Sequence, residues 1–427
     1  MVAIPHVDFE KFRLRTLVDE LIKRGEVKVH DQQVDLCDLS RHIEATPKAS
    51  LFRQVGPERS ELVAAVSGSR KRVALAFGVN ERELADEFLR RRNNPQPIID
   101  IEQGVAPVQE IVWEGQDADL THLPFHLQHE LDGSVYISSA LDFTIDPQTG
   151  RRNLGARRLS LLNRHQAGTN LTAPSDLKKM YQACVERGEK LAINFALGSH
   201  PLDLLASQLR MPIEEPNLIG TMRGEPVPMV KGITNDIHVP ADAEVVIEGY
   251  LDEKGYLEPD GPYGEYAGYY GPMHLNPVFH VTAVTMRKDA LHQSVLHGAG
   301  PIMDQNESGN LGGIVLEART KELVQMMGIE VTAVYVPPSG AEGQHVHLAI
   351  RQSKPGHGRN AIAAVIAGIH NVKHVFVVDE DIDIFNHKQM DWAMATRFQS
   401  DRDLITFPGV MGMPLDPSRN GPPPGTK

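Results

Sequence analysis

Residues 258 to 272 read Glu-Pro-Asp-Gly-Pro-Tyr-Gly-Glu-Tyr-Ala-Gly-Tyr-Tyr-Gly-Pro. The stretch holds three carboxylates, four tyrosines, four glycines and three prolines, a mixture too often broken by Gly and Pro for a helix interior. We therefore predict a shaped loop. Its tyrosines are expected to place Asp260 and Glu265 against apolar ring faces, where desolvation favours a protonated carboxyl and a usable general acid. The alternative is a surface turn with solvated acids, the common state of such loops.

The chain carries further motifs on both sides of this loop. The order Asp260-Gly261-Pro262-Tyr263-Gly264-Glu265, followed by Gly268-Tyr269-Tyr270, resembles the signature of the UbiD-like decarboxylases, which use prenylated flavin mononucleotide (FMN). The resemblance runs from about residue 10 to about residue 420, and its other motifs follow in the family's order. They are Asn153-Leu154-Gly155-Ala156-Arg157-Arg158, Glu215 eight residues before Arg223-Gly224, Lys354 to Arg359, and Asp379 to Arg397.

The composition is that of an ordinary globular protein. At 427 residues the chain is long enough for two or three domains. A formal net charge of −13 and a pI near 5.8 argue against a nucleic-acid-binding surface, which is normally basic. The two cysteines are too few for a disulfide framework, no apolar run is long enough to span a bilayer, and the N-terminus lacks a signal-peptide pattern. These features predict a cytoplasmic protein that binds neither nucleic acid nor membrane.

We expect a mixed α/β (α+β) chain of several domains. The first, residues 1–105, is predicted to be a small α/β domain. It should contain an amphipathic helix over residues 14–22 that stops at Gly25, and a second helix over residues 81–92. Its predicted strands are residues 50–55 and 73–78.

Residues 106–305 form the second predicted domain, which is rich in strands. Residues 146–150 are a hairpin-turn signal between two strand-like runs. Strands joined by turns, with few long helices, favour an antiparallel barrel or sandwich. The resemblance implies a split β-barrel that binds the flavin. The predicted strands are residues 108–113, 135–145, 159–162, 192–197, 245–250 and 278–296.

A linking helix and a third domain complete the predicted organisation. The linker is residues 306–328, of which 306–313 are expected to be flexible and 317–327 helical. Strand-like and helix-like runs then alternate over residues 329–427, which predicts an α/β domain. The resemblance implies that this C-terminal domain supports assembly into a homodimer or higher homo-oligomer. Its predicted strands are residues 330–336, 345–351 and 374–378, and its predicted helices are residues 359–369 and 388–396.

Asn153, His165 and Glu215 are the candidate metal ligands. An amide oxygen, an imidazole and a carboxylate together suit Mn²⁺ or Mg²⁺ beside a phosphate. By spacing alone the signal is weak, because a single histidine among 19 is more often an ordinary surface or core residue. The resemblance implies that these three residues hold a divalent ion, usually manganese, which bridges to the flavin phosphate, with K⁺ nearby.

Arg158, Asp260 and Glu265 are the candidate catalytic residues. A fixed guanidinium can hold a carboxylate through two parallel hydrogen bonds, whereas the alternative for Arg158 is a surface position in a hairpin. Arg158 follows Asn153 by five residues, so in a regular strand the two side chains point to opposite faces unless Gly155 hosts a bulge. The resemblance implies an acid, arginine and acid network in which Glu265 donates the proton. The first acid is commonly Glu in the family, and Asp260 is one methylene shorter.

The resemblance also implies a wider set of cofactor contacts. Arg157 stands where relatives often have an aromatic residue, and Lys388 precedes a Met390-Asp391-Trp392-Ala393 run similar to that of a lysine that reaches the flavin phosphate. A lysine on a helix surface is an equal alternative for Lys388. The complete predicted set for the cofactor is Asn153, Ala156, Arg157, Arg158, Arg164, His165, Glu215 and Lys388.

The activity implied by the resemblance is the reversible, non-oxidative decarboxylation of an aromatic or heteroaromatic carboxylic acid, for example of the indole, pyrrole, furan or hydroxybenzoate type. Prenylated FMN would hold the electron pair left when CO₂ departs, and the protein would supply orientation and electrostatics. A flavin prenyltransferase is then the expected supplier of the cofactor. Two alternatives are a metal-dependent hydrolase built on the three candidate metal ligands, and a non-catalytic flavin-binding subunit of a carboxylase complex. The retention of all three candidate catalytic residues argues against the second alternative.

Overall fold

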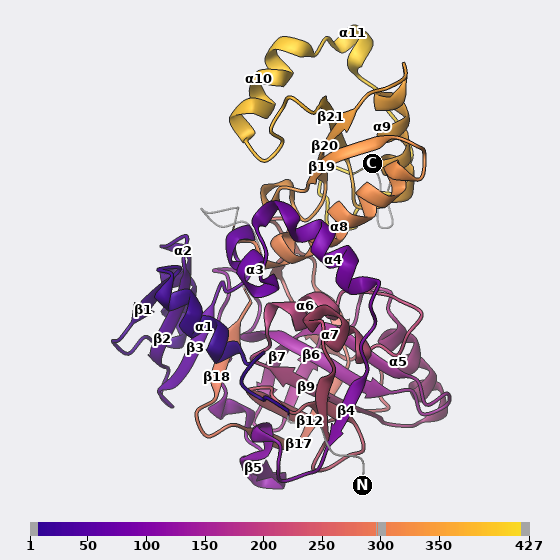
Figure 1. Cartoon of the computed structure of the whole chain (residues 1–427). Helices are drawn as coiled ribbons and strands as arrows, with labels where there is room; N and C mark the ends of the chain where they lie inside the picture. The colour runs from indigo at the N-terminus through magenta and orange to yellow at the C-terminus, as the bar shows by residue number, and fades with distance from the viewer. Residues whose placement is uncertain (1–6, 296, 298–304, 420–427) are drawn as a thin grey trace. The chain divides into compact units, whose positions relative to one another are not determined.

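A computed structural model describes residues 7–295, 297 and 305–419 of the chain. The described residues divide into two compact units. The first lies within Met1–Val79, Arg90–Gly264 and Tyr270–Leu296, and the second lies within Asn80–Leu89, Glu265–Tyr269 and His297–Lys427. Each unit has its own sheets (Figure 1). Each unit also has its own apolar core.

The first unit begins with a mixed four-stranded sheet. Its strands, in spatial order, are β1 (Val27–His30), β2 (Ala49–Val55), β3 (Ser60–Ala64) and β18 (Leu291–Ser294). The pairs β1–β2 and β3–β18 are parallel, and β2–β3 is antiparallel. β2 confirms the strand predicted over residues 50–55. Because β18 comes much later in the sequence, a strand from the end of the predicted second domain completes the N-terminal sheet.

The N-terminal helices follow from apolar spacing and end signals. Helix α1 (Leu14–Lys23) buries its apolar face, and Gly25 follows it at a φ of 72°, which confirms the helix predicted there. A 3₁₀ turn (Glu81–Glu83) and α4 (Leu84–Arg92) together confirm the second predicted helix. Helix α2 spans Leu39–Glu44.

The strand predicted over residues 73–78 is wrong, because this run belongs to helix α3 (Arg70–Phe77). The side chain of Ser69 accepts a hydrogen bond from the N–H of Arg72, and Gly78 ends the helix at a φ of 74°. A short apolar run has no periodicity that separates strand from helix. The cap residues on either side decide the outcome.

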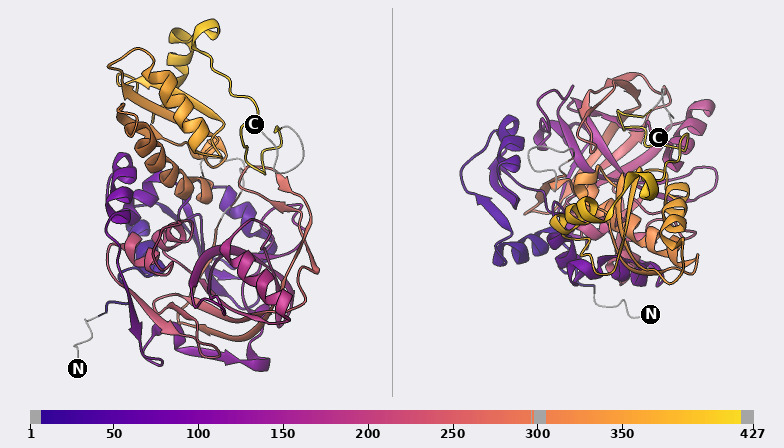
Figure 2. Two further views of the ribbon diagram at one scale, coloured as in Figure 1. Left: turned by 90° about the vertical axis from the view of Figure 1, so that its right-hand side faces the viewer. Right: turned by 90° about the horizontal axis from the view of Figure 1, so that it is seen from above.

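Six antiparallel strands of the first unit close into a barrel (Figures 1 and 2). In order round the ring they are β12 (Val245–Leu251), β9 (Leu191–Leu197), β6 (Tyr136–Ile145), β7 (Arg152–Asn163), β8 (Gln166–Thr169) and β17 (Val278–Met286). β17 pairs back with β12, which closes the ring. The interior is apolar, with the rings of Phe195 and Phe279 5.0 Å apart between centroids. The predicted strand-rich barrel is confirmed.

Two of the strands predicted for this region differ from the structure. The run over residues 278–296 breaks after Met286 into β17 and β18, and residue 296 lies outside the described residues. The run over residues 108–113 is a strand only from Ile111, as β5 (Ile111–Glu114), because a 3₁₀ turn that starts at Pro107 comes first. The predicted turn at residues 146–150 joins β6 to β7, with the N–H of Gly150 donating to Asp146 O at 2.8 Å.

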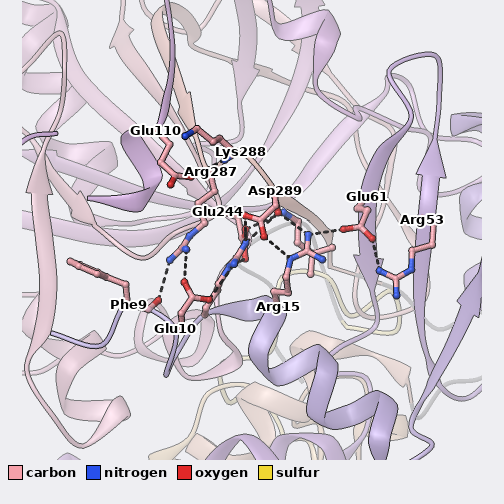
Figure 3. A network of polar contacts seen from close by, with 12 residues as sticks. Phe9, Glu10, Arg15, Arg53, Glu61, Glu110, Glu244, Arg287, Lys288 and Asp289 are labelled. Carbon is pink, nitrogen blue, oxygen red and sulfur yellow. Dashed lines mark hydrogen bonds and ion pairs between the residues drawn. The ribbon is translucent and has the colours of Figure 1, made fainter. Parts of the chain in front are cut away.

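Charged side chains tie the segment between β17 and β18 to the start of the chain, as Figure 3 shows. Arg287 donates to Glu10 at 2.7 Å. Arg15 of α1 lies 3.6 Å from Asp289 and 2.6 Å from Glu61 of β3. These pairs hold the chain on its way into β18, and so help to complete the N-terminal sheet.

The remaining elements of the first unit lie before or between the barrel strands in the sequence. A small sheet has the order β11 (His238–Pro240), β10 (Val227–Lys231) and β4 (Ile98–Ile101). The helices are α5 (Asp176–Arg187), α6 (Pro201–Ala206) and α7 (Asn217–Arg223). The apolar side of α5 packs on the barrel core.

The second unit is a three-layer α/β arrangement. Its sheet has the order β19 (Glu330–Tyr335), β20 (His345–Arg351) and β21 (His374–Asp379), and its helices are α8 (Glu307–Gln325), α9 (His357–Gly368), α10 (His387–Arg397) and α11 (Ser400–Asp403). Apolar residues of α8 and α9 pack on one face of the sheet, and residues of α10 pack on the other. Figure 2 shows the orange helix α9 alongside the sheet. The alternating strands and helices predicted for this region are confirmed.

The flexible segment predicted over residues 306–313 is wrong, because it forms the first turns of α8. Asn306 caps the helix by accepting a hydrogen bond from the N–H of Gly309. Gly309 and Gly313 are buried, and a Cβ on Gly313 would lie 3.2 Å from the carbonyl oxygen of Val336. The glycines therefore allow close packing of the helix rather than mobility. Within the described residues, no helix combines the length and apolar character that crossing a bilayer requires.

Candidate active site

The Gly/Pro-rich stretch over residues 258–276 contains two short antiparallel ladders. Strand β13 (Glu258–Asp260) pairs with β16 (His274–Asn276), and β14 (Tyr263–Gly264) pairs with β15 (Tyr270–Gly271). A neighbouring loop braces them: Asp132 accepts a hydrogen bond from the N–H of Gly264 at 2.9 Å, and Gly133 donates to Pro262 O at 2.8 Å. The intervening residues 265–269 belong to the second unit.

Arg158 and Asp260 meet within the first unit. Arg158 Nη2 donates to Asp260 Oδ2 at 3.2 Å, and its guanidinium lies 4.0 Å from the ring centre of Tyr263. The hydroxyl of Tyr136 donates to Asp260 Oδ1 at 2.8 Å, and Asn276 Nδ2 donates to Oδ2 at 2.9 Å. Arg158 is 9% exposed and Asp260 is 3% exposed, so the pair is largely desolvated. These five residues are called the arginine cluster below.

Asp260 is ionised in the arginine cluster. Burial by itself would raise its pKa, but His274 at 3.3 Å, the charge of Arg158 and the hydroxyl of Tyr136 outweigh burial and lower the pKa from 3.8 to about 2. Burial and the charge of Asp260 raise the pKa of Tyr136. The expectation that ring faces would keep Asp260 protonated is therefore wrong, because the cationic neighbours win over desolvation. Its carboxylate orients Arg158 instead.

The two faces of β7 carry different polar groups. The register irregularity lies on β6, opposite Arg158, rather than at Gly155. Because β7 pairs without an extra residue from Asn153 to Arg158, these two side chains point to opposite faces. In the described part of the chain, no strand pairs with the outer edge of residues 152–157, since β8 begins to pair only further along β7. A ligand that lies along this edge can reach both faces.

On the other face, Asn153, Asp142 and Glu215 gather at the start of β7. Asn153 Nδ2 donates to Asp142 Oδ2 at 2.9 Å, and Glu215 Oε2 accepts from the N–H of Leu154 at 2.7 Å. Asn153 and Glu215 are at most 2% exposed, and Asp142 is fully buried. Gly155 permits this approach, because a Cβ there would lie 2.6 Å from Asp142 Oδ1. Asn153, Asp142 and Glu215 are called the amide–acid cluster below.

Arginines stand beside the amide–acid cluster. Arg157 Nε lies 3.5 Å from Asp142 Oδ1, but neither atom makes a hydrogen bond. Arg151 Nη2 lies 3.3 Å from Glu215. Burial raises the pKa of both carboxyl groups. Arg157 also donates at 3.4 Å to Ser175, the residue that caps the N-terminus of α5. A buried, unsatisfied guanidinium nitrogen beside a helix N-terminus fits the phosphate end of a flavin nucleotide.

The structure places His165 and Arg164 at the far end of β7, in the turn to β8. His165 Nδ1 lies 3.2 Å from a backbone carbonyl, and the side chain of Arg164 is 75% exposed. From Asn153 the strand runs on for ten residues, which is on the order of 30 Å at about 3.3 Å per residue. Ligands of one ion lie within about 5 Å of one another. His165 is therefore not brought to Asn153 and Glu215, and the expected set of Asn, His and Glu does not fit.

Two predicted site residues lie in the second unit. Lys388 is exposed in the first turn of α10. The N–H of Glu265 donates to Tyr269 O at 3.0 Å, which closes a tight turn. Burial and the charge of Glu265 raise the pKa of Glu342 to about 8, so these two carboxyl groups lie close enough to interact.

Sequence reasoning missed three residues that complete the two clusters, namely Tyr136, Asp142 and Asn276. Asp142 had a signal, since it is a charge inside an apolar strand-like run, and buried charges need a partner or a function. Tyr136 and Asn276 had none, because their partner Asp260 is 124 and 16 residues away in the sequence.

Family models match the chain in three parts. The N-terminal domain model of the UbiD 3-octaprenyl-4-hydroxybenzoate carboxy-lyases matches residues 18–92. The Rift-related domain model matches residues 100–300, and the C-terminal domain model matches residues 309–427. The matched regions together cover most of the sequence.

Solved structures resemble the whole chain. The UbiD-class enzyme HmfF from Pelotomaculum thermopropionicum, in complex with FMN, is 32% identical, with a TM-score of 0.90 over 97% of this chain and 92% of that one. An evolved dimeric form of HmfF in complex with prFMN is 30% identical, with a TM-score of 0.86 over 94% and 93%. The apo 3,4-dihydroxybenzoic acid decarboxylase AroY from Klebsiella pneumoniae is 26% identical, with a TM-score of 0.87 over 96% and 90%.

Proposed function

The chain belongs to the UbiD family of carboxy-lyases, and on that premise we propose that it decarboxylates an aromatic or heteroaromatic carboxylic acid with prenylated FMN. The observation that carries this proposal is the arginine cluster, in which an ionised Asp260 holds the desolvated Arg158 at 3.2 Å. When bound, the cofactor supplies a sink for the electron pair left by CO₂. The candidate substrates are acids of the indole, pyrrole, furan and hydroxybenzoate types.

Arg158 binds the carboxylate of the substrate in this proposal. Asp260 and the ring of Tyr263 fix the guanidinium before substrate arrives, so little orientational freedom remains to be lost on binding. A desolvated guanidinium also attracts a carboxylate more strongly than one in water does. The result is a substrate whose scissile bond is held in one direction.

Glu265 donates the proton that replaces CO₂. Asp260 is ionised at neutral pH and has no proton to donate. The next acid of the same loop in the sequence is Glu265.

Arg157 and the N-terminus of α5 would hold the phosphate of the cofactor, and the open edge of β7 near Ala156 would leave the cofactor access to both clusters. Lys388 contributes a further cation, with K⁺ as an additional ion. A flavin prenyltransferase supplies the cofactor, and the C-terminal domain, residues 329–427, assembles the chain into a homodimer or higher homo-oligomer. The proposed domains before residue 329 are residues 1–105 and 106–305, followed by the linker 306–328.

The alternatives lose support from the same geometry. A hydrolase built on Asn153, His165 and Glu215 needs ligands around one ion, and His165 lies on the order of 30 Å along β7 from Asn153. An idle flavin-binding subunit has no need of a desolvated, charge-paired Arg158. A purified chain that is catalytic without flavin would reopen the first alternative.

The test is purification after co-expression with a flavin prenyltransferase. We expect a flavin absorbance spectrum, the mass of prenylated FMN in the extracted cofactor, and CO₂ release from at least one acid of a panel covering the four ring types. Protein purified without the prenyltransferase is the matched control and should release none. CO₂ release that is independent of the prenyltransferase would contradict the proposal.

A further inference from the structure

The amide–acid cluster departs from the metal set expected for the family, and the inference drawn from it rests on the proposed cofactor. We propose that this chain holds the divalent ion at its flavin phosphate with oxygen ligands alone. The ligands are Asn153 and Glu215, Asp142 fixes the amide of Asn153, and no histidine takes part.

The hydrogen bonds of the cluster set the ligand atoms. Because Asn153 gives its Nδ2 to Asp142 at 2.9 Å, its Oδ1, the atom that binds a cation, is turned away from that carboxylate. Glu215 reaches the next residue of the strand, Leu154, with Oε2 at 2.7 Å. One ligand group therefore comes from β7 and the other from the loop before α7, which contacts the next residue of the strand.

Asp142 provides an independent sign, because one of its carboxylate oxygens lacks a hydrogen-bond donor. It is fully buried, and its Oδ1 accepts no hydrogen bond, although a buried carboxylate oxygen normally has at least one donor. The nearest cation, Arg157 Nε, lies 3.5 Å away and is itself without a hydrogen bond. Gly155 leaves just enough room for the carboxylate over the strand. A buried carboxylate that is held in place but lacks a hydrogen-bond donor is consistent with a cation bound nearby.

Histidine is absent from this arrangement. Among the residues that the structure describes, no group of three His, Cys, Asp or Glu side chains could hold a metal ion, so no imidazole joins Asp142 and Glu215 as a third member. The two ligands, the amide of Asn153 and the carboxylate of Glu215, offer hard oxygen donors only. Such a set suits Mg²⁺ and Mn²⁺ and lacks the nitrogen ligand that favours Zn²⁺.

The experiment compares His165→Ala with Asp142→Asn in protein co-expressed with the prenyltransferase. Bound manganese is measured by mass spectrometry of the metal after equilibration with Mn²⁺, its affinity by electron paramagnetic resonance, and the flavin by absorbance. We expect His165→Ala to match wild type in bound manganese, in Mn²⁺ affinity and in flavin content. Asp142→Asn should bind Mn²⁺ at least about 10-fold more weakly, the usual effect of losing a residue that orients a ligand.

Loss of manganese in His165→Ala, or wild-type affinity in Asp142→Asn, overturns the proposal. If Asp142→Asn does not fold, as judged by circular dichroism, the result for His165→Ala still decides, because an ion ligated by His165, the histidine of the expected set, must be lost there. Wild-type protein that carries prenylated FMN but no Mn²⁺ overturns this inference and leaves the proposed function standing. Wild-type protein without flavin contradicts the proposed function itself.

Discussion

Asp260→Asn removes the charge that holds Arg158 in place. A carboxyl whose pKa falls from 3.8 to about 2 gains about 2.5 kcal/mol of stability from its ionised form, at about 1.4 kcal/mol for each tenfold change in proton affinity. Breaking one partner of a buried ion pair costs about 3–5 kcal/mol in other proteins. We therefore expect the free energy of unfolding of the first unit to fall by about 2–4 kcal/mol at pH 7. Turnover should be lost as well, because Arg158 is no longer fixed.

The stabilisation by Asp260 depends on pH in a direction that follows from its lowered pKa. The pKa of Asp260 is lower in the folded state than in the unfolded chain, so its stabilisation is complete above about pH 5 and is lost as the pH falls through 4 toward 2. The difference between wild type and Asp260→Asn should therefore shrink below about pH 4. Urea unfolding in a Trp392→Phe background reports the first unit, since Trp113 is then the remaining tryptophan.

The control for this prediction is Asp117→Asn, which changes an exposed acid of the same unit and should leave stability within about 0.5 kcal/mol of wild type. The reasoning is refuted if Asp260→Asn is as stable as wild type at pH 7. It is also refuted if the difference between the two proteins stays the same from pH 7 to pH 3.5.

Three further substitutions test the site. Arg158→Lys keeps the positive charge but loses the planar pair of donors, and should raise KM for the acid and lower kcat; unchanged values of both would show that Arg158 does not hold the carboxylate. Asp260→Glu restores the commoner family residue, and because Tyr136 and Asn276 already fit the shorter side chain at 2.8 and 2.9 Å, we expect lower stability in urea rather than a gain. Glu342→Gln should remove a loss of stability that wild type shows as the pH rises from about 4.5 to about 8, because the folded state favours the protonated carboxyl; equal pH profiles in thermal unfolding would contradict this.

The parts of the fold that could be predicted are those with local signals. α1 has apolar residues at helical spacing and a glycine stop, and β6 and β7 are strand-like runs joined by a turn. α3 could not be assigned in the same way, because its short apolar run reads equally as a strand until Ser69 and Gly78 are recognised as caps. The start of α8 was predicted to be flexible because it contains several glycines, but these glycines allow the helix to pack closely.

The candidate site was predictable where a motif names adjacent residues, and not where the fold brings distant ones together. The contact between Arg158 and Asp260 spans 102 residues and came from the resemblance alone. His165 was assigned from the resemblance, and the extended run of β7 carries it away from Asn153. The position of Asp142 in the site could not be predicted, because it depends on the pairing of β6 with β7, which sets Asp142 opposite Gly155.

The central claim is that this chain replaces a carboxylate with a proton delivered by Glu265. Its most direct test is decarboxylation in deuterated water, with wild type and Glu265→Gln both loaded with prenylated FMN and shown by absorbance to carry equal amounts. Wild type should release CO₂ and place one deuterium at the former carboxylate carbon, whereas Glu265→Gln should do so at least roughly 10²-fold more slowly, the scale expected for loss of a general acid. Equal rates of CO₂ release and deuterium incorporation in the two proteins would contradict the account.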